Sequence, residues 1–116
     1  MNQAIVRKED ADAYTDEQIA IKYLGKEKVE KYISYLFEYA YKEASFLCMP
    51  RKGLEFNNLC RTRRNEGLDM ITNVIVEIIY KTGIEDPIKF RKNIDIDLYM
   101  VKNIEADLHR RYGRDD

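Results

Sequence analysis

The sequence predicts an all-α protein, an up-down antiparallel bundle of three long helices preceded by a short one. Apolar residues recur at spacings of three and four along most of the chain, which is the helical period. No segment alternates polar and apolar residues, and no Asn-Gly or Asp-Gly pair marks a hairpin. Both prolines, Pro50 and Pro87, stand where helices should break, and the short turns make neighbouring helices antiparallel.

The chain is long enough for one hydrophobic core. Its 116 residues carry a formal net charge of −1, and its two cysteines, Cys48 and Cys60, lack metal-binding spacing. The start Met-Asn-Gln-Ala lacks an apolar signal region, and no apolar run approaches the roughly 20 residues of a membrane span. We expect a cytoplasmic protein that does not enter membranes, with a flexible N-terminus over 1–13 and a single helical-bundle domain over 14–116.

The first helix is expected to be short. Thr15 and Gln18 have the spacing of an N-cap and its reciprocal partner, so the helix begins there and runs to about Leu24. Gly25 then ends it or kinks it into the next helix. The first 30 residues lean acidic, through Glu9, Asp10, Asp12, Asp16, Glu17, Glu27 and Glu30.

The second helix is expected over residues 26–47. Its interior stripe is Val29, Ile33, Leu36, Phe37, Ala40, Ala44 and Leu47, with tyrosines at positions 32, 35, 39 and 41 along the edges. Apolar or tyrosine side chains therefore surround more than half of this helix, which is more than one small bundle should bury. The excess predicts a homo-oligomer.

The third helix is expected from Leu54 to Thr82, with Gly83 ending it. Its apolar stripe, between Leu68 and Ile79, continues toward the N-terminus into Arg64 and then Arg61. An arginine at the centre of an apolar face is costly unless another group answers its charge. Either an internal carboxylate pairs with it, or the bundle leaves that end open for an anionic partner.

The last helix supplies a candidate carboxylate. Asp86 is its expected N-cap and Pro87 its first residue, and the helix should continue to about Tyr112. If a tight turn joins it to the third helix, Arg64 faces Glu105 across the hairpin. We predict an internal Arg64–Glu105 pair, which would fix the helix register more than it would stabilise the fold.

The sequence gives no support for catalysis. The single histidine, His109, lies in a last helical turn, where a cation complements the helix dipole, and one histidine cannot build a bundle-type di-metal site. No Gly-rich phosphate loop and no nucleophile elbow is present. We therefore expect no enzymatic activity, no cofactor and no metal.

Basic residues gather between positions 48 and 67, where only Glu55 and Glu66 oppose them. The basic residues there are Arg51, Lys52, Arg61, Arg63 and Arg64. Guanidinium groups suit phosphate and carboxylate alike, so Arg61, Arg63 and Arg64 are equally consistent with a binding role and an internal one. For Arg91 and Lys92, farther along the chain, a solvated face is the expectation.

Four features, taken together, match the pattern of one known family. They are Tyr32-Ile33-Ser34-Tyr35-Leu36, the turn Met49-Pro50-Arg51-Lys52, an arginine-bearing third helix with Leu68 to Ile79, and a last helix with Asp97, Leu98 and Leu108. This pattern, over residues 28–112, resembles the accessory variability determinant proteins of diversity-generating retroelements. Those proteins are related to the four-helix-bundle proteins encoded in ribosomal-RNA intervening sequences.

The resemblance implies a non-enzymatic accessory subunit. Family members form ring-like oligomers, commonly pentamers, and bind the reverse transcriptase of the element and its template RNA. The nucleic-acid contacts implied here are Arg51 and Lys52 in the turn and Arg61, Arg63 and Arg64 on the third helix. Members are typically basic, whereas this chain is slightly acidic. Protein binding is therefore the better supported part of the implication.

Two other classes of function remain open. One is a small protein-binding helical regulator or inhibitor of mobile-element or phage origin, docking through the tyrosine-edged second helix. Tyrosine and arginine dominate interface energetics, and the chain has nine tyrosines and no tryptophan. The other is an oligomeric scaffold whose extra apolar surface serves self-assembly.

Overall fold

All regular structure in the described part of the protein is helical. A computed structural model describes residues 7–112, which form α1 (Lys8–Leu24), α2 (Lys26–Phe46), α3 (Leu54–Thr82), α4 (Pro87–Asn93) and α5 (Ile96–Tyr112). The all-α class predicted from the sequence is confirmed. None of the helices in this range is long and apolar enough to cross a membrane.

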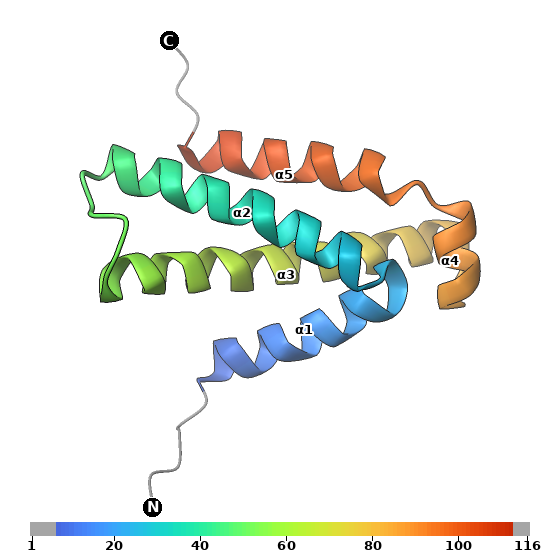
Figure 1. Ribbon diagram of the computed structural model, residues 1–116. Coiled ribbons are helices and arrows are strands. Elements are labelled where there is room, and N and C mark those ends of the chain that lie inside the picture. The colour runs from blue at the N-terminus through green and yellow to red at the C-terminus, as the bar shows by residue number, and fades with distance from the viewer. Residues whose placement is uncertain (1–6, 113–116) are drawn as a thin grey trace, which may run out of the picture.

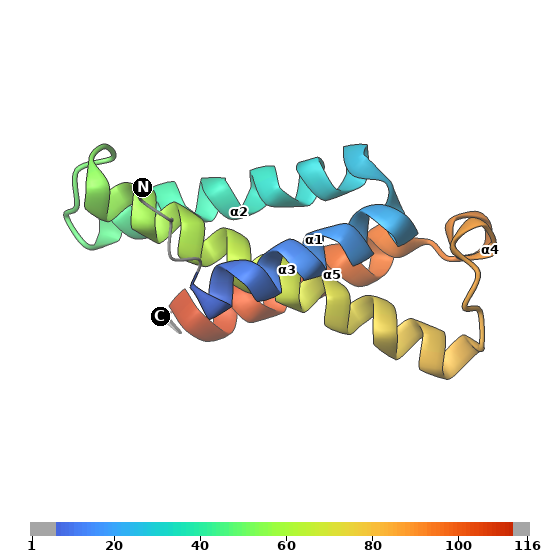
Figure 2. The ribbon, with the colours of Figure 1, turned by 90° about the horizontal axis from the view of Figure 1, so that it is seen from below.

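The longest helix, α3, runs through the centre of the molecule and contacts α1, α2 and α5 (Figure 1). The chain direction of α2 and α5 is opposite to that of α3, and the short α4 lies against α1 at the end where α3 finishes. Both views show the loop between α2 and α3 reaching beyond the start of α1 and the end of α5 (Figures 1 and 2). This hairpin therefore projects from the rest of the bundle.

The core lies between α1, α2 and α3 and is closed by apolar residues of α4 and α5. Its largest fully buried side chains are Tyr32, Phe90, Leu68, Ile71, Ile75, Met100 and Val29. In α3 the periodic stripe supplies most of this core, as its spacing of three and four predicts. The Leu36 side chain of α2 packs against the α3 backbone at Gly67, so an added Cβ there would collide with it.

The bounds of α2 and α3 follow the sequence signals closely. The third helix begins and ends at the expected residues, and Gly83, with φ of 73°, caps it in the left-handed conformation while its N–H bonds the Ile79 carbonyl. The second helix ends at Phe46, one residue earlier than expected. Gly25, with φ of 88°, separates α1 from α2.

The first helix is longer than expected. It begins at Lys8, and the Thr15 hydroxyl bonds the Ala11 carbonyl at 3.2 Å inside the helix, so Thr15 is not an N-cap. The expected flexible segment 1–13 is therefore helical from Lys8 onward, while residues 1–6 lie outside the described range. Tertiary contacts explain the extension, because Ala13 is buried and Asp10 bonds Asn65 of α3.

The expected last helix is two helices. Asp86 is the N-cap as predicted, accepting a hydrogen bond from the Lys89 N–H at 3.1 Å, but Ile94 is extended and ends α4. The break lets Phe90 turn into the core, where its ring meets that of Tyr23 edge-on at 5.3 Å. A new helix, α5, begins at Ile96 and runs back alongside α3.

Candidate functional site

Arg63, at the centre of the predicted nucleic-acid-binding cluster, is held inside the bundle. Its Nε and Nη2 donate to the two carboxylate oxygens of Glu43 at 2.8 and 2.9 Å, and Nη1 donates to Glu66 at 2.9 Å. The Arg63 side chain is 15% exposed and that of Glu43 is 9% exposed. A bidentate guanidinium–carboxylate pair this well covered joins α2 to α3 and leaves Arg63 poorly placed for a phosphate.

Arg64 is also paired internally, but not with the predicted residue. Its guanidinium bonds the carboxylate of Glu17 on α1. The Arg64–Glu105 pair predicted from the sequence is therefore wrong, while the expectation that an internal carboxylate answers Arg64 agrees with this contact. The physical reason is register: α4 and the break before Ile96 bring Arg110, rather than Glu105, opposite Glu66 and Met70 in α3.

Arg61 completes the internal set. Its Nε lies 3.8 Å from an Asp10 carboxylate oxygen, which also accepts a hydrogen bond from Asn65 at 2.8 Å. Two acidic residues of α1, Asp10 and Glu17, thus lie against basic residues of α3. Three of the predicted nucleic-acid contacts are engaged within the protein.

Arg51 and Lys52 are the predicted contacts that stay at the surface. Both lie in the turn after α2 and are exposed. Arg51 Nη2 donates to the Ser45 hydroxyl, and its guanidinium lies over the ring of Tyr41, 5.9 Å from the centroid. The Tyr41 ring in turn contacts that of Phe56 at 5.0 Å.

Large apolar side chains are exposed beside these two cations. Phe46 is 61%, Leu47 54% and Leu54 76% exposed. We call the surface formed by Phe46, Leu47, Arg51, Lys52 and Leu54 the hairpin end. It combines apolar area with positive charge at the projecting tip of the α2–α3 hairpin.

The backbone of the turn is fixed by hydrogen bonds rather than left loose. The N–H of Met49 bonds the Ala44 carbonyl and that of Cys48 bonds the Ser45 carbonyl, at 2.8 and 3.2 Å. This is the Schellman pattern of helix termination, with Cys48 at φ of 56° in the place usually taken by glycine. These bonds hold the backbone at Leu47 in a defined position.

The tyrosine edge predicted for α2 does not form one docking surface. Tyr32 is fully buried and Tyr39 partly buried, whereas Tyr35 and Tyr41 are exposed. Burial and the nearby Glu105 carboxylate raise the pKa of Tyr39. The exposed part of α2 is therefore smaller than the sequence pattern suggests.

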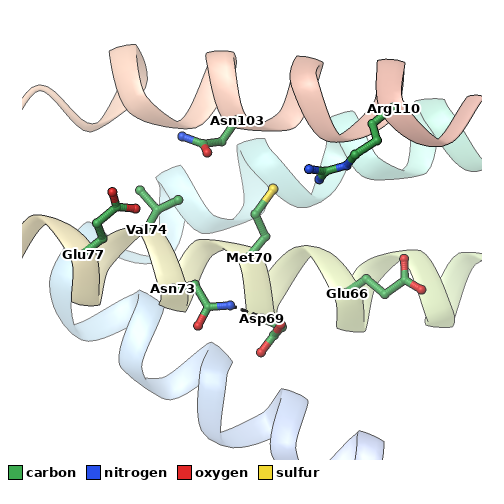
Figure 3. Close-up of a pocket in the computed structure, with 8 residues that line it drawn as sticks. All are labelled: Glu66, Asp69, Met70, Asn73, Val74, Glu77, Asn103 and Arg110. Carbon is green, nitrogen blue, oxygen red and sulfur yellow. Dashed lines mark hydrogen bonds between the residues drawn. The ribbon is translucent and has the colours of Figure 1, made fainter. Parts of the chain in front are cut away.

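A cleft of about 310 Å³ lies between α3 and α5 (Figure 3). Its residues are Glu66, Asp69, Met70, Asn73, Val74, Glu77, Asn103 and Arg110. The acids already have partners: Glu66 pairs with Arg63, Glu77 with Lys81 at 2.9 Å, and Asp69 accepts from Asn73 at 3.3 Å. Sequence reasoning did not find this cleft, because it depends on how α5 returns along α3.

The described residues offer little for metal or thiol chemistry. Within them, no three His, Cys, Asp or Glu side chains gather closely enough to hold a metal ion. Burial raises the pKa of the Cys60 thiol, which disfavours the reactive thiolate.

Arg91 was expected on a solvated face. It is exposed, but it also donates hydrogen bonds to the carbonyls of Ile21 and Lys22 at 3.2 and 2.7 Å, at the C-terminus of α1.

No protein-family model, curated protein or solved structure matches this chain. Its own surface chemistry is therefore the guide to its function. The two relevant features are the exposed apolar and basic side chains of the hairpin end and the internal pairing of the α3 arginines.

Proposed function

We propose that this chain is a non-enzymatic accessory subunit that acts by binding another protein through the hairpin end. The observation that supports this proposal is the exposure of Phe46 and Leu47 before, and of Leu54 after, the projecting turn that carries Arg51 and Lys52. Exposed apolar side chains that gather in one place mark interaction surfaces, since isolated ones are ordinary but clusters are costly in water.

The family resemblance names a partner for this surface. In a diversity-generating retroelement the partner is the reverse transcriptase, with its template RNA as a further ligand. The alternative is a small regulator or inhibitor of mobile-element or phage origin that docks on a different protein. Both functions would use the same surface. In both, we propose that the helices are arranged as an up-down bundle.

The internal contacts favour protein over RNA as the direct ligand. Arg61, Arg63 and Arg64 are paired with acids of α1, α2 and α3, so Arg51 and Lys52 remain for phosphates. On single strands, the logarithm of the binding constant falls against the logarithm of the salt concentration with a slope of about −0.7 per phosphate contact. Two contacts give a slope of about −1.4 and five give about −3.5. A shallow slope is therefore part of this proposal.

Self-association is a second part of the proposal. The Cα radius of gyration is 15.7 Å, above the roughly 13 Å typical of a compact chain of this length. An open shape with exposed Phe37 and Tyr41 on α2 suits a homo-oligomer, with a pentameric ring as the form that the resemblance suggests. Light scattering at micromolar concentration should give more than the monomer mass, and a monomer would contradict this part.

The test of the main proposal is a titration of the purified chain with a retroelement reverse transcriptase, with and without template RNA. Leu54→Ser and Phe46→Ser should abolish binding to the protein. Val76→Ser, which changes an apolar residue of α3 that is 57% exposed elsewhere, should leave it unchanged. Equal binding by all three variants would contradict the hairpin end as the docking surface.

A further inference from the structure

The hairpin end carries a charge that differs in sign from the chain as a whole. The whole chain has a formal net charge of −1, but Lys42, Arg51 and Lys52 lie at or beside this tip. Glu43, on the same helix, is engaged by Arg63 at 2.8 Å, which leaves Glu55 as the opposing acid in the adjoining turn of α3. The local balance is positive, so the tip attracts negatively charged groups.

One of these cations is fixed in place by the fold. The guanidinium of Arg51 is held between the Ser45 hydroxyl and the ring of Tyr41, and that ring contacts Phe56, which is 6% exposed. A guanidinium carries five N–H donors, of which Ser45 uses one. An arginine that is already ordered loses little freedom on binding, and such arginines dominate interface energies.

The apolar neighbours restrict the class of partner. Phe46 is the one aromatic side chain of the hairpin end, and Leu47 and Leu54 are aliphatic, so this surface lacks the row of aromatic rings on which successive bases stack. Basic segments that hold anionic bilayers contain clusters of about four to eight Lys or Arg, more than the tip offers. A protein segment that carries both carboxylates and apolar side chains matches the surface in charge and in apolar area.

We propose that the hairpin end receives an acidic, apolar segment of the partner protein. Carboxylates of that segment bind Arg51 and Lys52, and its apolar side chains cover Phe46, Leu47 and Leu54. This inference rests on the proposed function, because it names the chemistry of the partner at the same surface. The bidentate geometry of a guanidinium favours a carboxylate at Arg51 over a neutral acceptor.

The test is a selection of displayed random 15-residue peptides against the immobilised full chain. The wild-type chain should enrich peptides that combine Asp or Glu with Leu, Ile or Phe. The Arg51→Glu/Lys52→Glu variant should lose affinity for those peptides by about tenfold or more, because its tip repels carboxylates. The control variant Lys92→Glu/Lys102→Glu, at exposed lysines of α4 and α5, should bind them as the wild type does.

Three results would overturn the inference. The first is enrichment of basic or neutral peptides. The second is that acidic peptides bind the Arg51→Glu/Lys52→Glu variant as well as they bind the wild type. The third is binding of the chain to phosphatidylserine vesicles, measured by sedimentation, or to poly(U), measured by retention, if both Leu54→Ser and Arg51→Glu/Lys52→Glu abolish that binding. The ligand of the hairpin end would then be a membrane or RNA. Failure of the proposed function is separate: in that case the reverse transcriptase does not bind, whatever peptides are selected.

Discussion

The buried phenol of Tyr32 in α2 donates a hydrogen bond to the Asp97 carboxylate in the first turn of α5. Lys28 and Lys31 approach the same carboxylate, with Nζ–oxygen distances of 3.3 and 3.8 Å. The Tyr32 bond, with help from these lysines, lowers the pKa of Asp97, while burial and the same bond raise that of Tyr32. The cluster fastens α5 to α2, which runs in the same direction.

This cluster predicts a specific acid sensitivity. A carboxyl whose pKa is lower in the folded state stabilises the fold above its unfolded pKa, near 3.8, and this contribution disappears as the pH falls through the folded value. Tyr32→Phe removes the main cause of the lowering and should cost about 1.5 kcal/mol at neutral pH, because the lost bond is to a charged group.

The measurement is urea unfolding at pH 7 and at about pH 3, followed by circular dichroism. The difference in unfolding free energy between wild type and Tyr32→Phe should shrink at the acid pH. The matched control is Tyr35→Phe, which removes a hydroxyl from an exposed tyrosine of the same helix. A constant difference between wild type and Tyr32→Phe at both pH values would show that the bond to Asp97 contributes no pH-dependent stability.

The Arg64–Glu17 pair predicts energetic coupling between α1 and α3. The two side chains are 33% and 23% exposed, so water partly screens the pair and we expect a coupling of about 1 kcal/mol. A double-mutant cycle with Arg64→Ala and Glu17→Ala measures it, and an Arg64→Ala and Glu105→Ala cycle should give a coupling near zero. The reverse ranking would favour the register predicted from the sequence.

Arg63 should matter more for stability than its neighbours. Arg63→Ala removes the bidentate partner of the well-covered Glu43 carboxylate, which should cost about 3 kcal/mol, whereas Arg61→Ala, at a partly exposed 3.8 Å contact, should cost about 0.5 kcal/mol or less. Replacing Arg63 with Met and Glu43 with Leu together should recover much of the loss, since the desolvation cost of this pair then disappears. Similar melting temperatures for Arg63→Ala and Arg61→Ala would contradict this ranking.

Local signals in the sequence were sufficient where the chemistry is local. Gly83 and the Asp86–Pro87 pair mark helix ends because they suit a left-handed residue and a first helical turn. The predicted N-cap at Thr15 was wrong because the capping pattern is local and the helix start is not. Contacts of Asp10 with α3 extend α1 toward the N-terminus, past Thr15. The prediction that an internal acid pairs with Arg64 named Glu105 instead of Glu17, because the sequence did not reveal that α4 sets the register of α5.

The Cys48 backbone yields the last prediction. Cys48 adopts φ of 56° at the end of α2, a left-handed conformation that costs a residue with a Cβ about 1–2 kcal/mol and glycine almost nothing. Cys48→Gly should therefore stabilise the protein by about 0.5–1 kcal/mol, after allowance for the larger conformational freedom of glycine in the unfolded chain. Cys48→Ala is the control, because it removes the thiol but keeps the Cβ, and it should change the unfolding free energy little. If Cys48→Gly and Cys48→Ala shift the urea midpoint equally, the thiol rather than the backbone determines stability at this turn.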